Sequence, residues 1–228
     1  MEKKYVVQLV MLSLLSCSGL FIIEQVLELS YFIKTAAKII LFLLIPLLYI
    51  KFVMKRSILQ FLNLKTMDWK NLQQGILLGF LSMVIVIGAF IIFKDFINTD
   101  TILVDIQSRM KITPEIFIFI AIYITFGNSL LEEFYFRGFL FLHIHETENK
   151  VFAYLYSALL FSIYHVAIFA VWFDFWIMLL ALFGLFIIGL VFNWINTKSN
   201  NFLNSWILHI LADVGVMLIG FYLFGFFS

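Results

Sequence analysis

Two adjacent glutamates and one arginine interrupt an apolar run at residues 130–140, LLEEFYFRGFL. Glu133 and Arg137 are four residues apart, so on a helix they share a face and can form an ion pair, which would also suit a purely structural role. Glu132 lies about 100° away around the same helix, where no residue of that helix answers its charge. A charged side chain at the centre of a membrane helix costs roughly 2.5–3.5 kcal/mol on insertion scales. This group of three therefore indicates a functional site.

Two of the four histidines also lie within apolar sequence. LLFSIYHVAIF carries Phe161 and His165 one helical turn apart, and SWILHILADVG carries His209 and Asp213 at the same spacing. An aspartate one turn after a histidine can orient its imidazole ring. A single buried histidine is most often a satisfied core residue, but two histidines and the acidic residues on three apolar helices indicate a shared site.

These residue types suit hydrolysis of a peptide bond inside the membrane, which needs an activated water molecule and stabilisation of the tetrahedral oxyanion. Glu132 is the candidate general base, and His165 would help to hold the water. His209 would donate a hydrogen bond to the oxyanion, with Asp213 fixing its ring. Glu132, His165 and His209 would equally form a zinc site, where the metal polarises water and carbonyl. The sequence leaves the zinc-dependent and the metal-free versions open.

The composition is that of a membrane protein. Of the 228 residues, 64% are hydrophobic and only 13% are charged, and the mean hydropathy is +1.06; soluble domains are about half apolar and a quarter charged. The formal net charge of +1 gives no basic face for nucleic acid. Cys17 is the only cysteine, so it cannot form a disulfide within the chain.

Runs of roughly 20 apolar residues, the length that crosses a bilayer, predict an all-α, polytopic transmembrane bundle with a single integral-membrane domain over residues 1–228. An eighth helix would also fit. The first run resembles a cleavable lipoprotein signal ending at Cys17, but it continues beyond that point, which favours a retained span. The seven expected spans cover residues 5–26, 36–54, 72–93, 114–143, 150–171, 173–195 and 205–226.

The distribution of basic residues predicts a cytoplasmic N-terminus. With that orientation nine lysines and arginines lie on the cytoplasmic side, against five on the other: Lys34, Lys38, Lys94, Arg109 and Lys111. The segment at residues 55–70 mixes bases with aromatic residues, and we expect it along the cytoplasmic interface. His143 and His145 belong to the polar segment HIHETENK, which predicts a solvated surface.

Three motifs carry a resemblance to a known family. Glu132-Glu133-xxx-Arg137, Phe161-xxx-His165 and His209-xxx-Asp213 occur in that order, each inside an apolar helix. This pattern resembles the CAAX protease and bacteriocin-processing (CPBP, or Abi) family of intramembrane proteases, over a motif-bearing core at about 114–226. The third motif departs from the best-studied relatives, which have asparagine where this chain has Asp213. An ionised aspartate accepts hydrogen bonds but cannot donate one to an oxyanion.

The resemblance implies a multi-pass membrane endopeptidase, of metallo- or glutamate type, with Glu132, His165, His209 and Asp213 catalytic. Glu133, Arg137 and Phe161 would support them, and a Zn²⁺ ion, if required, would bind Glu132, His165 and His209. The implied substrate is a membrane-associated peptide or lipid-associated protein, such as a bacteriocin leader, a pheromone precursor or an immunity-related protein. The Ile, Phe, Asn and Lys richness suggests the cell membrane of a Gram-positive bacterium, where prenylated substrates are not expected.

Two further interpretations stay open. The chain could be a non-catalytic membrane regulator or bacteriocin-immunity protein that binds a membrane partner. It could also be a transporter with the buried acids as a proton relay, although no inverted hydropathy repeat supports this. Positions counted from the span centres put Glu132 and His209 on one side of the membrane and His165 on the other, which conflicts with a shared site.

Overall fold

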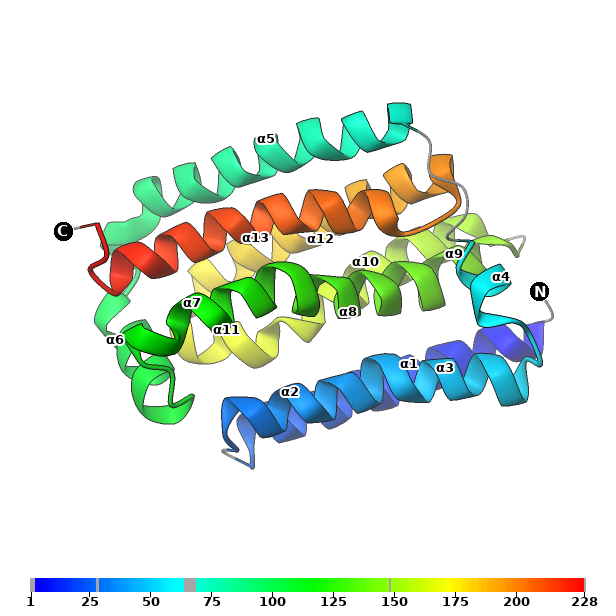
Figure 1. The fold of residues 1–228 in the computed structure, drawn as a ribbon, viewed down its shortest axis with the longest axis horizontal. Helices are drawn as coiled ribbons and strands as arrows, with labels where there is room; N and C mark the ends of the chain where they lie inside the picture. The colour runs from blue at the N-terminus through cyan, green and yellow to red at the C-terminus, as the bar shows by residue number, and fades with distance from the viewer. Residues whose placement is uncertain (1–2, 28, 64–68, 148, 228) are drawn as a thin grey trace.

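The computed structural model describes residues 3–27, 29–63, 69–147 and 149–227, and within these ranges it contains helices and turns but no strand. Seven helical segments are long and apolar enough to cross a membrane, which confirms the predicted all-α, multi-pass bundle. The helices run side by side along the long axis, with the two termini at opposite ends (Figure 1). Their bounds are Lys4–Gln25, Tyr31–Val53, Leu72–Phe96, Pro114–His145, Lys150–Trp172, Phe175–Ser199 and Leu203–Leu223.

Several spans are divided by π-helical or irregular turns. The first, third, sixth and seventh contain one long α-helix each: α1 (Lys3–Gln25), α5 (Trp69–Phe93), α12 (Phe175–Ser199) and α13 (Leu203–Leu223). The second comprises α2 (Tyr31–Ile39), η1 (Ile40–Leu44), α3 (Ile45–Leu48) and η2 (Tyr49–Val53). The fourth comprises α7 (Pro114–Ile122), η5 (Tyr123–Asn128), α8 (Ser129–Glu133), η6 (Phe134–Phe141) and α9 (Leu142–His145). The fifth comprises α10 (Lys150–Tyr164) and α11 (Val166–Trp172). The third span ends in the short helix η3 (Lys94–Phe96), and α4 (Ile58–Leu62), α6 (Thr99–Val104) and η4 (Asp105–Arg109) lie between spans.

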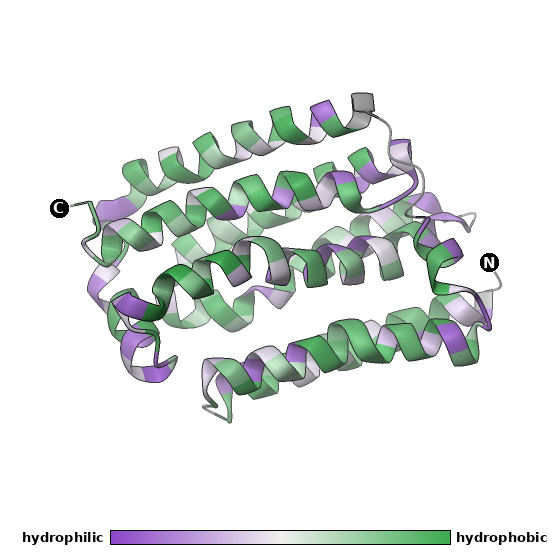
Figure 2. Ribbon diagram, in the orientation of Figure 1, coloured by the Kyte–Doolittle hydropathy of each residue, from purple (hydrophilic) through white to green (hydrophobic). Residues whose placement is uncertain are grey.

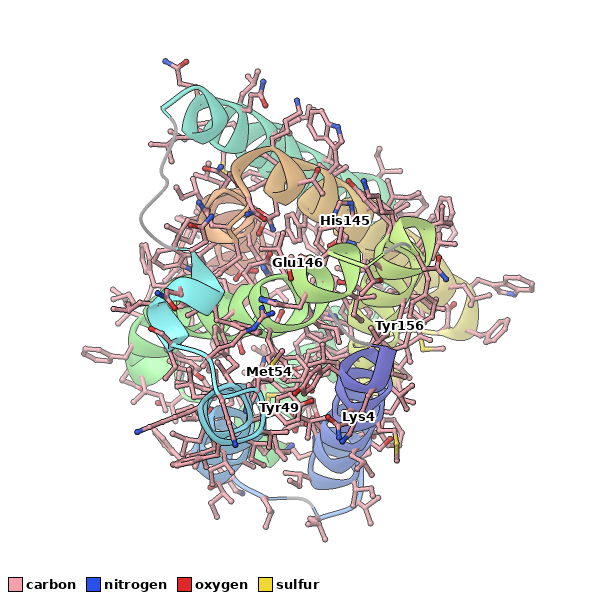
Figure 3. All side chains as sticks on the ribbon, turned by 90° about the vertical axis from the view of Figure 1, so that its right-hand side faces the viewer. Lys4, Tyr49, Met54, His145, Glu146 and Tyr156 are labelled. Atoms are coloured by element: carbon pink, nitrogen blue, oxygen red, sulfur yellow. The ribbon has the colours of Figure 1, made fainter. Side chains whose placement is uncertain are left out.

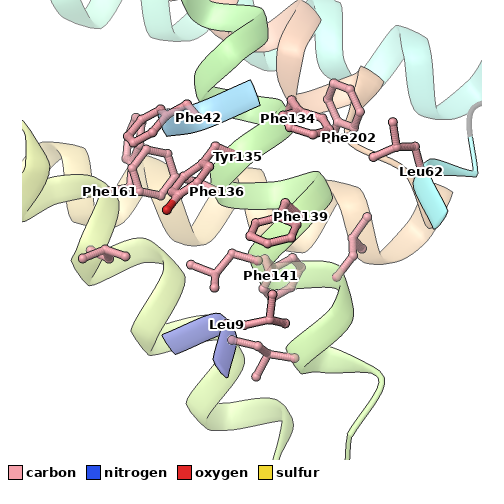
Figure 4. Packing of buried hydrophobic residues seen from close by; sticks show 14 of the residues in the cluster. Leu9, Phe42, Leu62, Phe134, Tyr135, Phe136, Phe139, Phe141, Phe161 and Phe202 are labelled. Carbon is pink, nitrogen blue, oxygen red and sulfur yellow. The ribbon is translucent and has the colours of Figure 1, made fainter. Parts of the chain in front are cut away.

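The fourth span is the centre of the bundle. Its residues 131–144 are buried on every side, as expected of a helix surrounded by other helices rather than by lipid. Aromatic rings fill the space around it (Figure 4): Phe42 of η1 stacks on Tyr135 at 4.0 Å between ring centroids, and Phe136 contacts Phe161 edge-to-face at 5.4 Å. The hydropathy colouring shows apolar residues along the spans, and polar residues mainly at the two ends (Figure 2).

Glycines allow the helices that carry the site to approach closely. A Cβ atom at Gly79 of α5 would stand 2.6 Å from Leu211 Cδ1 of α13, and one at Gly75 would stand 2.9 Å from the Asn204 carbonyl oxygen. At Gly189 of α12, a Cβ would stand 3.1 Å from Ala158 Cα of α10. Small residues at such crossings are the usual way in which membrane helices gain packing contacts.

Two sequence-based expectations about polar residues are wrong, that for Lys34 and Lys38 and that for His143. Lys34 and Lys38 are buried within the second span, Tyr31–Val53, so neither counts as a lysine beside the membrane. The predicted span at 36–54 already included Lys38 but not Lys34. Phe61, in the segment at 55–70, is buried and stacks on His143 with 3.3 Å between ring centroids; the interfacial position of this segment stays a prediction. His143 is buried rather than solvated, and its Nδ1 contacts the Gly138 carbonyl oxygen at 2.9 Å.

The bundle end next to the N-terminus is closed by contacts between neighbouring elements. Figure 3 views this end, with Lys4 on α1, Tyr49 on η2, and His145 and Glu146 at the end of the fourth span. Arg56 Nη1 lies 3.9 Å from Glu146 Oε2, which joins the segment before α4 to the fourth span. Residues 64–68, the remainder of that connection, lie outside the described ranges.

Candidate active site

Glu132 of α8 lies at the centre of a buried polar cluster and is only 2% exposed. Lys38 of α2 places its Nζ 2.5 Å from Glu132 Oε1, and the Asn128 amide donates a hydrogen bond to the same oxygen at 3.0 Å. Lys38 also donates to Asn128 Oδ1. One carboxylate oxygen is therefore fully engaged by a cation and an amide.

The second oxygen of Glu132 faces both histidines predicted for the site. Glu132 Oε2 is 3.9 Å from His165 Nε2 and 3.9 Å from His209 Nε2. It is buried and has no hydrogen-bond partner among the described residues. A separation of 3.9 Å leaves room for a water molecule at hydrogen-bond distance, ~2.8 Å, from Glu132 Oε2 and from either imidazole nitrogen. The structure thus brings Glu132, His165 and His209 to a single point, although counting from span centres separated them.

His165 is held at the break between α10 and α11. Its Nδ1 is 2.8 Å from the carbonyl oxygen of Phe161, which can only accept, so the ring proton lies on Nδ1. The Phe161 ring also contacts the imidazole edge-to-face at 4.8 Å between centroids. In the neutral ring, Nε2 then presents a lone pair toward Glu132. Phe161, predicted as a supporting residue, contributes both its carbonyl and its ring.

His209 of α13 is oriented by Glu133 rather than by Asp213. Glu133 Oε1 lies 3.0 Å from His209 Nδ1, and Phe192 of α12 stacks against the ring at 5.3 Å. Asp213 Oδ1 lies 3.6 Å from Nε2, on the edge of the ring that faces Glu132. Asp213, predicted to fix this ring, therefore lies on its Nε2 edge, and Glu133 from another helix holds the Nδ1 edge.

The Glu133–Arg137 pair predicted from the four-residue spacing is present and fully buried. Arg137 Nη1 donates to Glu133 Oε1 at 3.0 Å, and both side chains are 0% exposed. The guanidinium lies over the rings of Phe161 and Phe192, at 4.1 and 4.6 Å from their centroids. The same Glu133 oxygen that accepts from Arg137 contacts His209, so this pair supports an imidazole directly.

The charges in the cluster balance when His209 carries a proton on both ring nitrogens. Three carboxylates, those of Glu132, Glu133 and Asp213, then face three cations: Lys38, Arg137 and the His209 imidazolium. A buried group of charges is tolerated only when its members are paired, so a neutral total suits this environment. In that state His209 Nε2 carries a hydrogen atom that can be donated.

Zinc fits this arrangement less well than water does. Four-coordinate zinc holds its ligands at 2.0–2.2 Å, which places neighbouring donor atoms about 3.4 Å apart, whereas the Glu132 oxygen is 3.9 Å from each imidazole nitrogen. Within the described residues no group of three or more His, Cys, Asp or Glu side chains is arranged to hold a metal ion. The ammonium group of Lys38 on the same carboxylate would also repel a second cation.

The sequence analysis missed Lys38 and Asn128. Lys38 was counted among the basic residues beside the membrane, although the predicted span at 36–54 includes it, in the stretch TAAKIILFLL. Because six apolar residues follow Lys38 directly, it could have been recognised as an intramembrane lysine, and therefore as a candidate site residue. Asn128 stands four residues before Glu132, the spacing at which side chains meet on a helix.

Comparison with known proteins gives one match. Residues 114–215 match the family model described as "Type II CAAX prenyl endopeptidase Rce1-like". No curated protein and no solved structure matches the chain. The matched segment includes all seven site residues predicted from the three motifs, whereas Lys38 lies outside it. The matched segment covers less than half of the chain, and over it the chain is similar to the membrane peptidases that this family model describes.

Proposed function

We propose that this protein is an intramembrane endopeptidase that hydrolyses a peptide bond of a membrane-associated peptide or protein, with water activated by Glu132 and His165. The observation that carries the proposal is the convergence of Glu132 Oε2 with two imidazole Nε2 atoms, each 3.9 Å away, inside an apolar bundle. The similarity of residues 114–215 to a peptidase family model supports the same reaction class.

In the proposed reaction the water molecule donates one hydrogen bond to Glu132 Oε2 and a second hydrogen bond to His165 Nε2. Glu132 takes its proton as the water oxygen bonds to the carbonyl carbon, and the carbonyl π electrons move to oxygen. His209 Nε2–H donates to this oxyanion. The proton on Glu132 then passes to the leaving nitrogen as the C–N bond breaks, which yields a carboxylic acid and an amine and restores the carboxylate.

Asp213 would stabilise the protonated form of His209 from the Nε2 side, where it lies 3.6 Å away. Glu133 would do the same from the Nδ1 side, at 3.0 Å. Because carboxylates flank His209 on both edges, the ring can stay protonated, and this explains how Asp213 can support catalysis at a position where relatives have asparagine. The aspartate does not need to donate a hydrogen bond, because the imidazolium does.

The metal-free, glutamate-type version is the one we favour, because Lys38 already provides a cation on Glu132. A Zn²⁺ ion held by Glu132, His165 and His209 remains the alternative, and it would polarise water and carbonyl. Metal analysis of the purified protein and the effect of a chelator on peptide cleavage distinguish the two. A stoichiometric metal whose removal abolishes cleavage would establish the zinc version.

We further propose that the protein lies in the cell membrane of a Gram-positive bacterium with its N-terminus in the cytoplasm. Its substrates would be bacteriocin leaders, pheromone precursors or immunity-related proteins. A non-catalytic immunity or regulatory role, exerted by binding a membrane partner, is the competing function. It predicts that the biological effect survives loss of Glu132.

The test uses the full chain in lipid nanodiscs and a panel of internally quenched peptides: apolar leader peptides and one farnesylated CAAX peptide. We expect cleavage of at least one peptide by the wild-type protein, and a loss of at least about 100-fold in Glu132→Gln. Glu115→Gln, which alters an exposed carboxylate at the start of the same span, is the matched control and should keep full activity. Cleavage of no peptide by the wild type, or equal cleavage by Glu132→Gln, would contradict the proposal.

A further inference from the structure

We propose that Lys38 is a positioning residue for Glu132, so that the first two spans complete an active site whose family motifs all lie in the last four. This inference rests on the proposed peptidase function. Lys38 lies on α2, outside the matched residues 114–215. A site built only from the matched segment would leave the charge of Glu132 without its nearest cation.

Every direction in which the Lys38 ammonium can donate is occupied. It lies 2.5 Å from Glu132 Oε1 and donates a second hydrogen bond to Asn128 Oδ1. The remaining side faces aromatic rings, with Nζ 5.0 Å from the centroid of Tyr164 and 5.6 Å from that of Phe42. Such a group is fixed in place, and it fixes the carboxylate that it binds.

As a consequence, the two carboxylate oxygens of Glu132 have different roles. Lys38 and Asn128 both engage Oε1, which leaves Oε2 directed at His165 and His209. Without the ammonium group, the carboxylate could rotate, and its charge would turn toward another donor. The distance from Oε2 to the two imidazoles would no longer be set, and the proposed base would lose its alignment with the water.

The hairpin of α1 and α2 is attached to the rest of the bundle beside the site, through the end of α1. Lys34, one turn before Lys38, forms an ion pair with Glu24 at 2.5 Å, which joins the two helices beside their connecting turn. Gln25 at the end of α1 donates to the Ala167 carbonyl oxygen on α11. Ala167 follows His165 by two residues, so the hairpin is attached next to the histidine that Glu132 faces.

A stabilising role alone does not account for this placement. Removing two charges from water costs more free energy than many buried pairs regain, so a buried ion pair is a weak stabiliser of a fold. Lys34, on the same helix, forms a pair that joins two helices, and its partner Glu24 is 25% exposed, whereas the partner of Lys38 is buried. Lys38 instead binds the one carboxylate that points at both imidazoles.

The experiment compares Lys38→Met, Lys38→Arg and the matched control Lys34→Met in nanodiscs, with whichever panel peptide the wild type cleaves best. We expect Lys38→Met to lose roughly 100-fold in kcat while KM changes less than about threefold, because binding of the peptide is not altered. Lys38→Arg should recover about a tenth or more of the wild-type kcat. Lys34→Met should keep kcat within about threefold.

A second measurement covers the case in which Lys38→Met folds poorly. Lys38→Ala leaves room for a small amine, so added ethylammonium should raise its kcat at least about tenfold and leave Lys34→Met unchanged. Equal kcat losses in Lys38→Met and Lys34→Met, or absence of amine rescue, would overturn the positioning role. If Glu132→Gln keeps activity, the proposed function itself fails; if Glu132→Gln is inactive while Lys38→Met is fully active, only the role of Lys38 fails.

Discussion

Removal of the Arg137 charge is the perturbation with the largest expected effect on stability. Arg137 and its partner Glu133 are both 0% exposed and lie 3.0 Å apart. In Arg137→Met, the Glu133 carboxylate keeps only His209 as a neighbour of opposite charge. Breaking a buried ion pair from one side costs about 3–5 kcal/mol, because an uncompensated charge is left in a low-dielectric interior. We therefore expect a loss of that size in the free energy of unfolding.

A double variant separates the stability of this pair from its contribution to catalysis. Glu133→Gln/Arg137→Met removes both charges, and replacing a buried pair by neutral groups is often close to neutral, so stability should return to within about 1–2 kcal/mol of wild type. Peptide cleavage should stay reduced by about 10–100-fold, because His209 loses the carboxylate on its Nδ1. The same substitutions thus give opposite results in the two assays.

Unfolding by SDS in mixed micelles, followed by tryptophan fluorescence, measures the stability change. Arg109→Met is the control, since Arg109 also pairs at four-residue spacing, with Asp105 at 2.6 Å, but is partly exposed. Asp105 also keeps a second partner, the Trp172 indole at 2.8 Å. The control should lose about 1 kcal/mol or less. An Arg137→Met protein as stable as this control, or a double variant no more stable than Arg137→Met, would refute the reasoning.

Three other predictions use the same assays. Asp213→Asn should keep at least about a tenth of the wild-type kcat, because Glu133 still orients His209; a complete loss would assign Asp213 a direct role. Gly79→Ala should destabilise the protein by about 1–3 kcal/mol, since its Cβ would stand 2.6 Å from a Leu211 side-chain atom, whereas Gly88→Ala, with nothing within 4 Å, should not. A strong chelator should leave peptide cleavage unchanged, and loss of cleavage restored by zinc would reverse our preference for the metal-free mechanism.

Periodicity and apolar length were sufficient to predict the seven spans and the Glu133–Arg137 pair. Each depends on residues near in sequence, where helix geometry alone decides the contact. The orientation of His209 could not be predicted in the same way, because Glu133 lies on another helix. Local spacing offered Asp213 as the only partner within reach, and the crossing of α8 and α13 provided a better one.

Lys38 illustrates a second limit of predicting contacts from one amino-acid sequence. Its partner Glu132 is 94 residues further along the chain, and no spacing rule relates positions that far apart. The available signal was energetic: a lysine within an apolar run must find a counter-charge, and Glu132 was the buried acid without one. Treating these two unanswered charges as a pair would have predicted the contact between the second and fourth spans.

The depth of the two reacting side chains follows from their shared turn rather than from the span centres. Glu132 lies 13 residues before His145, the last residue of the fourth span, and His165 lies 15 residues after Lys150, the first residue of the fifth. At 1.5 Å per residue these are about 20 and 22 Å from the same turn, so antiparallel helices bring them level. The fourth span has 32 residues, far more than a bilayer requires, so its midpoint does not mark the middle of the membrane. Antiparallel neighbours should therefore be compared by distance from the turn that joins them, and with the span bounds of the structure this measure places Glu132 level with His165.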